Sequence, residues 1–205
     1  VGVELDNSYI SNEVISHNCD FIGSSHTLIS GSKLKNLSWI VPKKRIDGLD
    51  IYEDPVLDSI QTISGKTFKV PGRTYAIMVD VARGLGLDYS AFSVIDVSEI
   101  PYRQVAKYRS KEISPLIYPT IIYSTAVLYN NAFVLVEICD IGAQVADILH
   151  YELEYDNVIK VAIKGKQGQQ VSAGHVKRIQ LGVKTSSVTK KSGCANIKNM
   201  IETDN

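Results

Sequence analysis

The chain has 205 residues, of which 44% are hydrophobic and 21% charged, and its 22 Lys and Arg residues balance 22 Asp and Glu residues. This length suits one domain, or one domain with part of a neighbour, and the apolar fraction argues against wholesale disorder. The longest apolar runs, such as 132–136 and 158–163, are far too short to cross a bilayer. No secretion signal opens the sequence, and three cysteines (Cys19, Cys139 and Cys194) predict a reducing compartment without a disulfide framework.

The charge is unevenly distributed along the chain. Residues 1–158 contain 13 Lys and Arg against 20 Asp and Glu, whereas residues 159–205 contain 9 against 2. An acidic body followed by a basic segment fits carboxylate chemistry beside an anionic polymer. A solvated surface loop is the simpler alternative for the basic segment.

The chain from Tyr75 onward has the pattern of an α/β unit. A nearly unbroken apolar run, Tyr75–Val81, predicts a strand that is buried on both faces. A glycine-rich turn separates it from a second predicted strand, Ala91–Val97, and a third follows at Gln104–Tyr108. Because the links between them are short, we expect the three strands to form an antiparallel meander.

Two helix–strand units follow the predicted meander. Ser114 and Pro115 can begin a helix that would run to about Tyr129, because proline is tolerated in the first helical turn. The elements expected after it are a strand at Phe133–Glu137, a helix at about Gly142–Glu152 and a strand at Val158–Ile163. The order β-β-β-α-β-α-β predicts a mixed α/β sheet flanked by helices, with the fourth strand parallel to the first.

Asp80 and Glu137 end the first and the fourth predicted strands. Because parallel neighbours end at the same edge of a sheet, we expect these two carboxylates to lie together there. Two partly buried acids are costly unless a cation neutralises them, and hard divalent cations prefer oxygen ligands. The alternative is that each acid caps the turn or helix that follows it.

Two glycine motifs imitate nucleotide-binding loops. Ser64–Thr67 is similar to the end of a P-loop, but Ile60 stands where that motif needs glycine, so we reject it. Gly84 and Gly86 do not form a dinucleotide fingerprint, because Tyr89 occupies the third glycine position. We expect this second motif to be a turn between strands beside the two acids.

Several stretches, in order and with near family spacing, resemble the large terminase subunit of tailed bacteriophages with contractile tails. They are Phe21–Ile29, Val79–Ser90, Pro101–Arg109, Val134–Gly142 and Gly182–Thr185. That family has an amino-terminal ATPase motor and a carboxyl-terminal nuclease with a ribonuclease H-like fold. The resemblance implies that residues 19–41 end the motor, 42–72 form a hinge or linker, and 73–205 form a truncated nuclease domain, with the ATPase centre absent.

The resemblance also implies the roles of three acids. Asp80 and Glu137 would be two of three acidic metal ligands, and Asp88 an acid close to the site. The third family ligand is an aspartate on a later helix that this sequence does not reach, so we expect this fragment to be inactive alone. The implied reaction is cleavage of concatemeric phage DNA in the host cytoplasm, with two Mg²⁺ or Mn²⁺ ions about 3.5–4 Å apart activating water and stabilising the leaving oxygen.

The basic segment is expected to hold the phosphate backbone of double-stranded DNA without reading its sequence. The candidate residues are Lys164, Lys166, Lys177, Arg178, Lys184, Lys190 and Lys191. In the full-length motor, the family's partners are the portal protein and other terminase subunits, and no membrane contact is expected. The alternative function is a catalytically incomplete DNA-binding module of the packaging motor.

Residues 1–18 resemble the carboxyl-terminal end of an intein, as a short β-rich remnant. In that family the last asparagine cyclises to cleave the backbone, the penultimate histidine assists, and the next residue accepts the acyl group. His17, Asn18 and Cys19 match these positions, and Asp6 is similar to an upstream acid that promotes the step. The resemblance implies protein splicing with an amino-terminal intein half as partner. An ordinary β-turn segment is the alternative.

Overall fold

The computed structural model describes residues 8–11, 14–17, 28–31, 33, 40–163 and 178–203. The chain divides into two compact units, one containing residues 40–189 and the other residues 1–39 with 190–205. The first, called the main unit below, carries the α/β pattern expected from the sequence.

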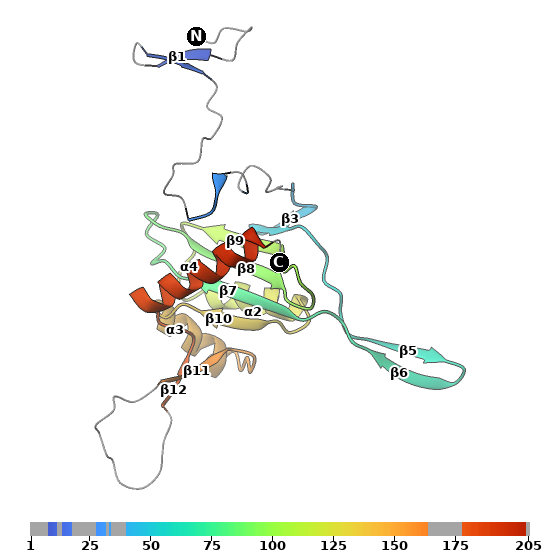
Figure 1. The fold of residues 1–205 in the computed structure, drawn as a ribbon. Helices are drawn as coiled ribbons and strands as arrows, with labels where there is room; N and C mark the ends of the chain where they lie inside the picture. The colour runs from blue at the N-terminus through green and yellow to red at the C-terminus, as the bar shows by residue number, and fades with distance from the viewer. Residues whose placement is uncertain are drawn as a thin grey trace. The chain divides into compact units, whose positions relative to one another are not determined.

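A six-stranded mixed sheet forms the centre of the main unit (Figure 1). Its order is β10 (Phe133–Val136), β7 (Tyr75–Asp80), β8 (Ser90–Asp96), β9 (Arg103–Ser110), β4 (Leu49–Ile51) and β3 (Lys44–Ile46). The strand β10 runs parallel to β7, and all other neighbouring strands in this sheet are antiparallel. The predicted meander and the predicted parallel return are therefore confirmed.

The helix α2 (Tyr118–Leu128) packs against the face of the sheet that carries Phe92 and Tyr108. The rings of Phe92, Tyr108 and Tyr118 stack on one another, with centroids 5.2–6.2 Å apart. Tyr118 and Ile122 are fully buried, so they extend this aromatic stack into the hydrophobic core. The alternation of buried and partly exposed residues along β8 shows that this core lies on one face of the strand.

The start of α2 was predicted wrongly. The helix begins at Tyr118 rather than at Ser114, and the proline in its first turn is Pro119. Ser114 instead begins a turn, in which its carbonyl accepts hydrogen bonds from the N–H groups of Ile117 and Tyr118. The predicted end is confirmed, because Asn130 and Asn131 adopt left-handed φ angles of 55° and 56° that cannot continue a helix.

The second helical segment has the predicted bounds but two kinds of helix. An α-helix, α3 (Gly142–Asp147), continues directly into a π-helical turn, η1 (Ile148–Glu152). Val145 and Leu149 are fully buried and join the same core as α2. The sequence therefore predicted the position of this helical segment correctly, but it did not predict that the helix changes from α to π within it.

The fifth predicted strand lies outside the six-stranded sheet. The strand β11 (Lys160–Ile163) forms a separate antiparallel pair with β12 (Arg178–Leu181). Residues beside this pair still meet β10, because Val158 bridges to Val134 and Val183 bridges to Glu137, both in parallel. The sequence pattern had indicated the strand correctly but gave no sign of its partner.

The segment 42–72, for which a hinge or linker role stays a prediction, contributes two strands to the sheet. In β4, Leu49 and Ile51 are buried, and this strand pairs with β9. A second hairpin, β5 (Ser59–Ile63) with β6 (Lys66–Val70), is solvent-exposed along nearly its whole length. Ser64 and Gly65 form its turn with φ angles of 52° and 75°, so the rejected P-loop imitation is a hairpin turn.

Outside the main unit, β1 (Ser8–Ser11) pairs antiparallel with β2 (Val14–His17). Asp6, Asn18 and Cys19 lie outside the described residues, and the intein prediction stays a prediction. The helix α4 (Ser187–Glu202) begins where the Ser186 hydroxyl accepts a hydrogen bond from the Thr189 N–H at 3.1 Å. None of the helices in the described ranges is both long and apolar enough to cross a membrane.

Candidate active site

Asp80 and Glu137 meet at one edge of the sheet. Val79 and Val136 are partners in the parallel ladder between β7 and β10, and each acid is the next residue along its chain. The N–H of Glu137 donates a 2.9 Å hydrogen bond to the carbonyl of Val79, which continues this ladder past the end of β10. The register therefore places the two carboxylates side by side at the carboxyl ends of two parallel strands, as the sequence predicted.

The electrostatics of Asp80 reflect this arrangement. Partial burial raises the pKa of its carboxyl above the usual value, and the nearby charges of Glu137 and Asp88 raise it further, against an opposing hydrogen bond from the Val81 N–H. Neither Asp80 nor Glu137 forms an ion pair with a Lys or Arg side chain among the described residues. The site therefore concentrates negative charge that no Lys or Arg side chain of the described residues neutralises by an ion pair.

The loop after Asp80 is anchored at both ends. The Ala82 N–H donates to the Ser90 hydroxyl at 3.0 Å, and Ser90 is almost completely buried. Further along, the Gly86 N–H donates to the carbonyl of Lys111 at 3.1 Å. Gly84 has a φ of 71°, and a Cβ on it would lie 2.5 Å from the carbonyl oxygen of Ile113. Glycine is thus required at this position for both its conformation and its close packing.

The loop after Glu137 has an equally close contact. A Cβ on Gly142 would lie 2.0 Å from the carbonyl oxygen of Glu137, so only glycine fits there without displacing the backbone. The loops after β7 and β10 are joined by Arg83, whose Nε and Nη2 donate to Asp140 at 2.6 and 2.8 Å. No pattern in the sequence singled out Ser90 or the Arg83–Asp140 pair, although these residues lie within the family-like stretches 79–90 and 134–142.

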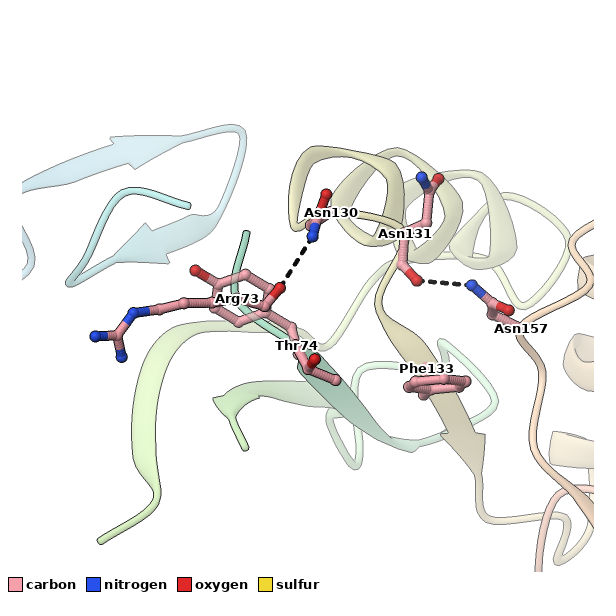
Figure 2. Close-up of a pocket in the computed structure, with 7 residues that line it drawn as sticks. Arg73, Thr74, Asn130, Asn131, Phe133 and Asn157 are labelled. Atoms are coloured by element: carbon pink, nitrogen blue, oxygen red, sulfur yellow. Dashed lines mark hydrogen bonds between the residues drawn. The ribbon is translucent and has the colours of Figure 1, made fainter. Parts of the chain in front are cut away.

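A pocket lies at the amino-terminal ends of β7 and β10, away from the ends that carry Asp80 and Glu137 (Figure 2). It has a volume of about 190 Å³ and is lined by Arg73, Thr74, Tyr75, Asn130, Asn131, Phe133 and Asn157. Asn130 donates to the carbonyl of Arg73 at 3.0 Å, and Asn157 donates to the carbonyl of Asn131 at 2.7 Å. These amide groups therefore tie the segment after α2 to residues just before β7 and β11. The pocket is separate from the edge of the sheet that carries Asp80 and Glu137.

Residues 77–205, more than half of the chain, match the family described as "Terminase RNaseH-like domain". The chain belongs to this family. The predicted ribonuclease H-like fold is thereby confirmed for the part of the chain from β7 onward. The match begins within β7 and includes both acids, whereas β3 and β4 precede it.

Solved structures of similar fold include the large terminase nuclease from thermophilic phage G20c. With bound magnesium, that protein is 17% identical, with a TM-score of 0.57 over 88% of this chain and 72% of that chain. With bound cobalt, it is 18% identical, with a TM-score of 0.56 over 88% and 72%. With bound zinc, it is 18% identical, with a TM-score of 0.54 over 84% and 75%. At this identity the likeness supports the terminase ribonuclease H-like fold.

The donor set of this terminase domain fits a divalent cation. Asp80 and Glu137 supply carboxylate oxygens, which are the ligands that Mg²⁺ and Mn²⁺ prefer, and a cation would neutralise the charge that raises the pKa of Asp80. Asp88 is exposed, and one of its carboxylate oxygens accepts the Tyr89 N–H at 2.8 Å. In the part of the chain that the structure describes, no group of three or more His, Cys, Asp or Glu side chains is placed to hold a metal.

The candidate DNA-binding residues are only partly within the described structure. Lys164, Lys166 and Lys177 lie outside the described residues, and of Arg178 only the backbone, at the start of β12, is described. Lys184, Lys190 and Lys191 are exposed. Their role in DNA binding therefore stays a prediction.

Proposed function

We propose that this terminase domain is a metal-dependent endonuclease that hydrolyses phosphodiester bonds of concatemeric viral double-stranded DNA. The observation that carries the proposal is the meeting of Asp80 and Glu137 at the ends of β7 and β10. The metal-bound structures of the similar phage G20c nuclease support it. The partners would be DNA and the other components of a packaging motor, in the cytoplasm of an infected bacterium.

In this proposal Asp80 and Glu137 hold Mg²⁺ or Mn²⁺, and Asp88 acts from the adjoining loop. When bound, such ions activate water and stabilise the leaving oxygen of a phosphodiester. The protein keeps the two carboxylates in place through the β7–β10 ladder, the Ser90–Ala82 hydrogen bonds and the Arg83–Asp140 pair. Rigid placement of the acids avoids reorganisation during the reaction, which is how a fixed site lowers a barrier.

The test is plasmid nicking by the full chain and by Glu137→Gln, in Mg²⁺, in Mn²⁺ and in EDTA. A parent that does not nick in either metal would agree with the sequence-based expectation that this fragment is inactive alone. A parent that nicks should do so only with metal, and the variant should then lose on the order of 100-fold or more in rate, because one ligand is gone. Glu152→Gln, at an exposed acid that ends η1, is the control and should nick like the parent. Equal nicking by Glu137→Gln and the parent would exclude Glu137 from the reaction.

A DNA-binding module that does not cleave is the second candidate. It is favoured by one observation, that the described residues do not bring three metal-binding side chains together. Salt-dependent DNA binding without nicking in either metal would support this function. Nicking that requires both metal and Glu137 would exclude it.

We also propose that residues 1–19 contain a protein-splicing junction, with residues 19–41 from the end of a motor domain beyond it. The antiparallel hairpin β1–β2 ends at His17, directly before Asn18 and Cys19 in the sequence. Asn18 would cyclise and Cys19 would accept the acyl group. Mass spectrometry after incubation with a matching amino-terminal intein half should find the first 18 residues removed, and an unchanged mass with full folding of both halves would oppose splicing.

A further inference from the structure

Arg109 lies in the same row of the sheet as Asp80, two strands away. Asp80 is paired with Ala91 between β7 and β8, and Ala91 is paired with Arg109 between β8 and β9. Side chains of directly opposed residues point to the same face, and neighbouring strands are about 4.8 Å apart. The backbone of Arg109 is therefore about 10 Å from that of Asp80, and both residues are exposed on the face opposite the Phe92 stack.

Tyr89 brings a second cation to this position. The guanidinium carbon of Arg109 and the Nζ of Lys111 each lie 4.9 Å from the centre of the Tyr89 ring. Attraction to the face of the ring explains why two like charges gather around one side chain. Tyr89, Arg109 and Lys111 are called the Tyr89 cluster below.

The charges of the Tyr89 cluster have no carboxylate within ion-pair distance among the described residues. Of the five arginines whose side chains are described, four bond to an aspartate: Arg45 to Asp50, Arg73 and Arg103 to Asp96, and Arg83 to Asp140. Arg109 is the exception, since it stacks on Tyr89 instead. Asp50 is near enough for the charge of Arg109 to lower its pKa, after the larger effect of Arg45, but no Arg109–Asp50 ion pair forms among the described residues. The exposed Arg109 and Lys111 side chains therefore remain available to attract an anion from solution.

The main chain holds this cluster in place. The Gly86 N–H donates to the carbonyl of Lys111, which ties the loop before Tyr89 to the residue after β9. The Ser110 hydroxyl accepts hydrogen bonds from the N–H groups of Glu112 at 3.2 Å and Ile113 at 3.1 Å, which fixes the turn that follows. The cations are thus presented by an ordered part of the fold at the same edge of the sheet as the two acids.

We propose that the Tyr89 cluster binds the phosphate backbone of DNA and holds the substrate strand beside Asp80 and Glu137. The proposal rests on the proposed function, since it assigns the surface that receives the substrate of that site. Because Arg109 and Asp80 are only two strands apart in one row of the sheet, a phosphate held at the cluster would lie close to a phosphodiester at the acids.

Charge explains why this site needs such a cluster. Asp80, Glu137 and Asp88 repel a phosphate backbone, as they also repel one another. Two cations nearby compensate for this repulsion on the side of the site where β8 and β9 continue the sheet. Contacts of this kind fix the register of the DNA and carry no sequence information.

The test measures binding of a fluorescein-labelled DNA duplex to the full chain by anisotropy, in EDTA, at several salt concentrations. We expect the double variant Arg109→Gln/Lys111→Gln to bind at least about tenfold more weakly at low salt, and its log–log salt slope to fall by about 2, because each lost phosphate contact removes about 0.9. The double variant Lys43→Gln/Lys66→Gln removes the same charge at two exposed residues outside both the cluster and the basic segment, and it should bind like the parent. Tyr89→Phe keeps the ring and should also bind like the parent, whereas Tyr89→Ala should bind more weakly.

The outcomes separate this proposal from the proposed function. If Arg109→Gln/Lys111→Gln binds DNA with the affinity and salt slope of the parent, the proposal that the Tyr89 cluster binds DNA is overturned, even if the parent cleaves DNA. An equal loss in both double variants would overturn it too, because the effect would then come from net charge alone. Weaker binding in the cluster variant together with no metal-dependent nicking by the parent would uphold the DNA surface and overturn the nuclease.

Discussion

Arg83 and Asp140 form a bidentate ion pair that joins the loop after Asp80 to the loop after Glu137. Both partners are largely exposed, with 65% and 57% of their side chains accessible. Exposed pairs contribute little to stability. The pair is therefore better placed to position two loops than to stabilise the fold.

Replacing Arg83 should separate these two effects. We expect Arg83→Gln to leave the midpoint of urea unfolding nearly unchanged and to reduce metal-dependent nicking several-fold, because the loops after the two acids lose their connection. Arg83→Lys should not restore the rate, since a lysine cannot make the two parallel hydrogen bonds. A full rate in Arg83→Gln would show that the loops hold their positions without the pair.

Replacing Ser90 should lower stability. Its hydroxyl accepts the Ala82 N–H at 3.0 Å and donates to the Ala82 carbonyl at 3.2 Å, and the residue is almost completely buried. Ser90→Ala leaves this N–H without its partner, so we expect a loss of about 1–2 kcal/mol in the free energy of unfolding, measured in urea. Ser93→Ala, which removes only a partly exposed acceptor of the Gln104 amide, is the control and should cost about 0.5 kcal/mol or less.

Replacing Gly142 should disturb Glu137 through the backbone. A Cβ there would lie 2.0 Å from the Glu137 carbonyl oxygen, so Gly142→Ala must move that segment. We expect a loss of about 1–3 kcal/mol in stability and a lower nicking rate. Gly193→Ala in α4, where a Cβ meets nothing within 4 Å, should instead be neutral or stabilise by up to about 1 kcal/mol. Equal stability of the two variants would contradict the close contact.

Asp96 should make stability depend on pH in the acid range. Burial raises the pKa of this carboxyl, but hydrogen bonds from Arg73, Ser98 and Arg103 outweigh burial and lower the pKa from 3.8 to about 2. A lowered pKa in the folded state means that the contribution to stability is complete above about pH 4 and is lost as the pH falls towards 2. Urea unfolding should therefore show little contribution of Asp96 to any change between pH 6 and 4, and a loss of stability from pH 4 to pH 3.

The variant Asp96→Asn removes the carboxylate that forms ion pairs with both Arg73 and Arg103. We expect it to lose on the order of 2 kcal/mol near neutral pH, because hydrogen bonds from arginine to a carboxylate are replaced by weaker ones. Its stability should also change less than that of the parent between pH 6 and 3. Asp147→Asn, at an exposed residue of α3, is the control and should retain the dependence of the parent.

Local sequence patterns were enough to predict the strands β7, β8, β9 and β10 and the residues at which two of them end. The run Tyr75–Val81 is largely apolar because β7 is an inner strand of the sheet, between β10 and β8. Asn130 and Asn131 end α2 through backbone geometry that is local to those residues. The parallel placement of Asp80 and Glu137 followed from the crossover through a helix. The sequence by itself was thus enough to predict that Asp80 and Glu137 lie together at one edge of the sheet.

Only the tertiary structure decided which distant segments complete the sheet and the surface beside the acids. The strands β3 and β4 have three residues each, too few for a periodic pattern, and β4 is formed because it pairs with β9 and buries Leu49 and Ile51. Tyr89 and Arg109 are 20 residues apart in the sequence and meet because β8 and β9 are antiparallel neighbours. The short link between β8 and β9 predicts that these strands pair. The register that brings Arg109 to Tyr89, and the pairing of β4 with β9, depend instead on which side chains the assembled sheet buries.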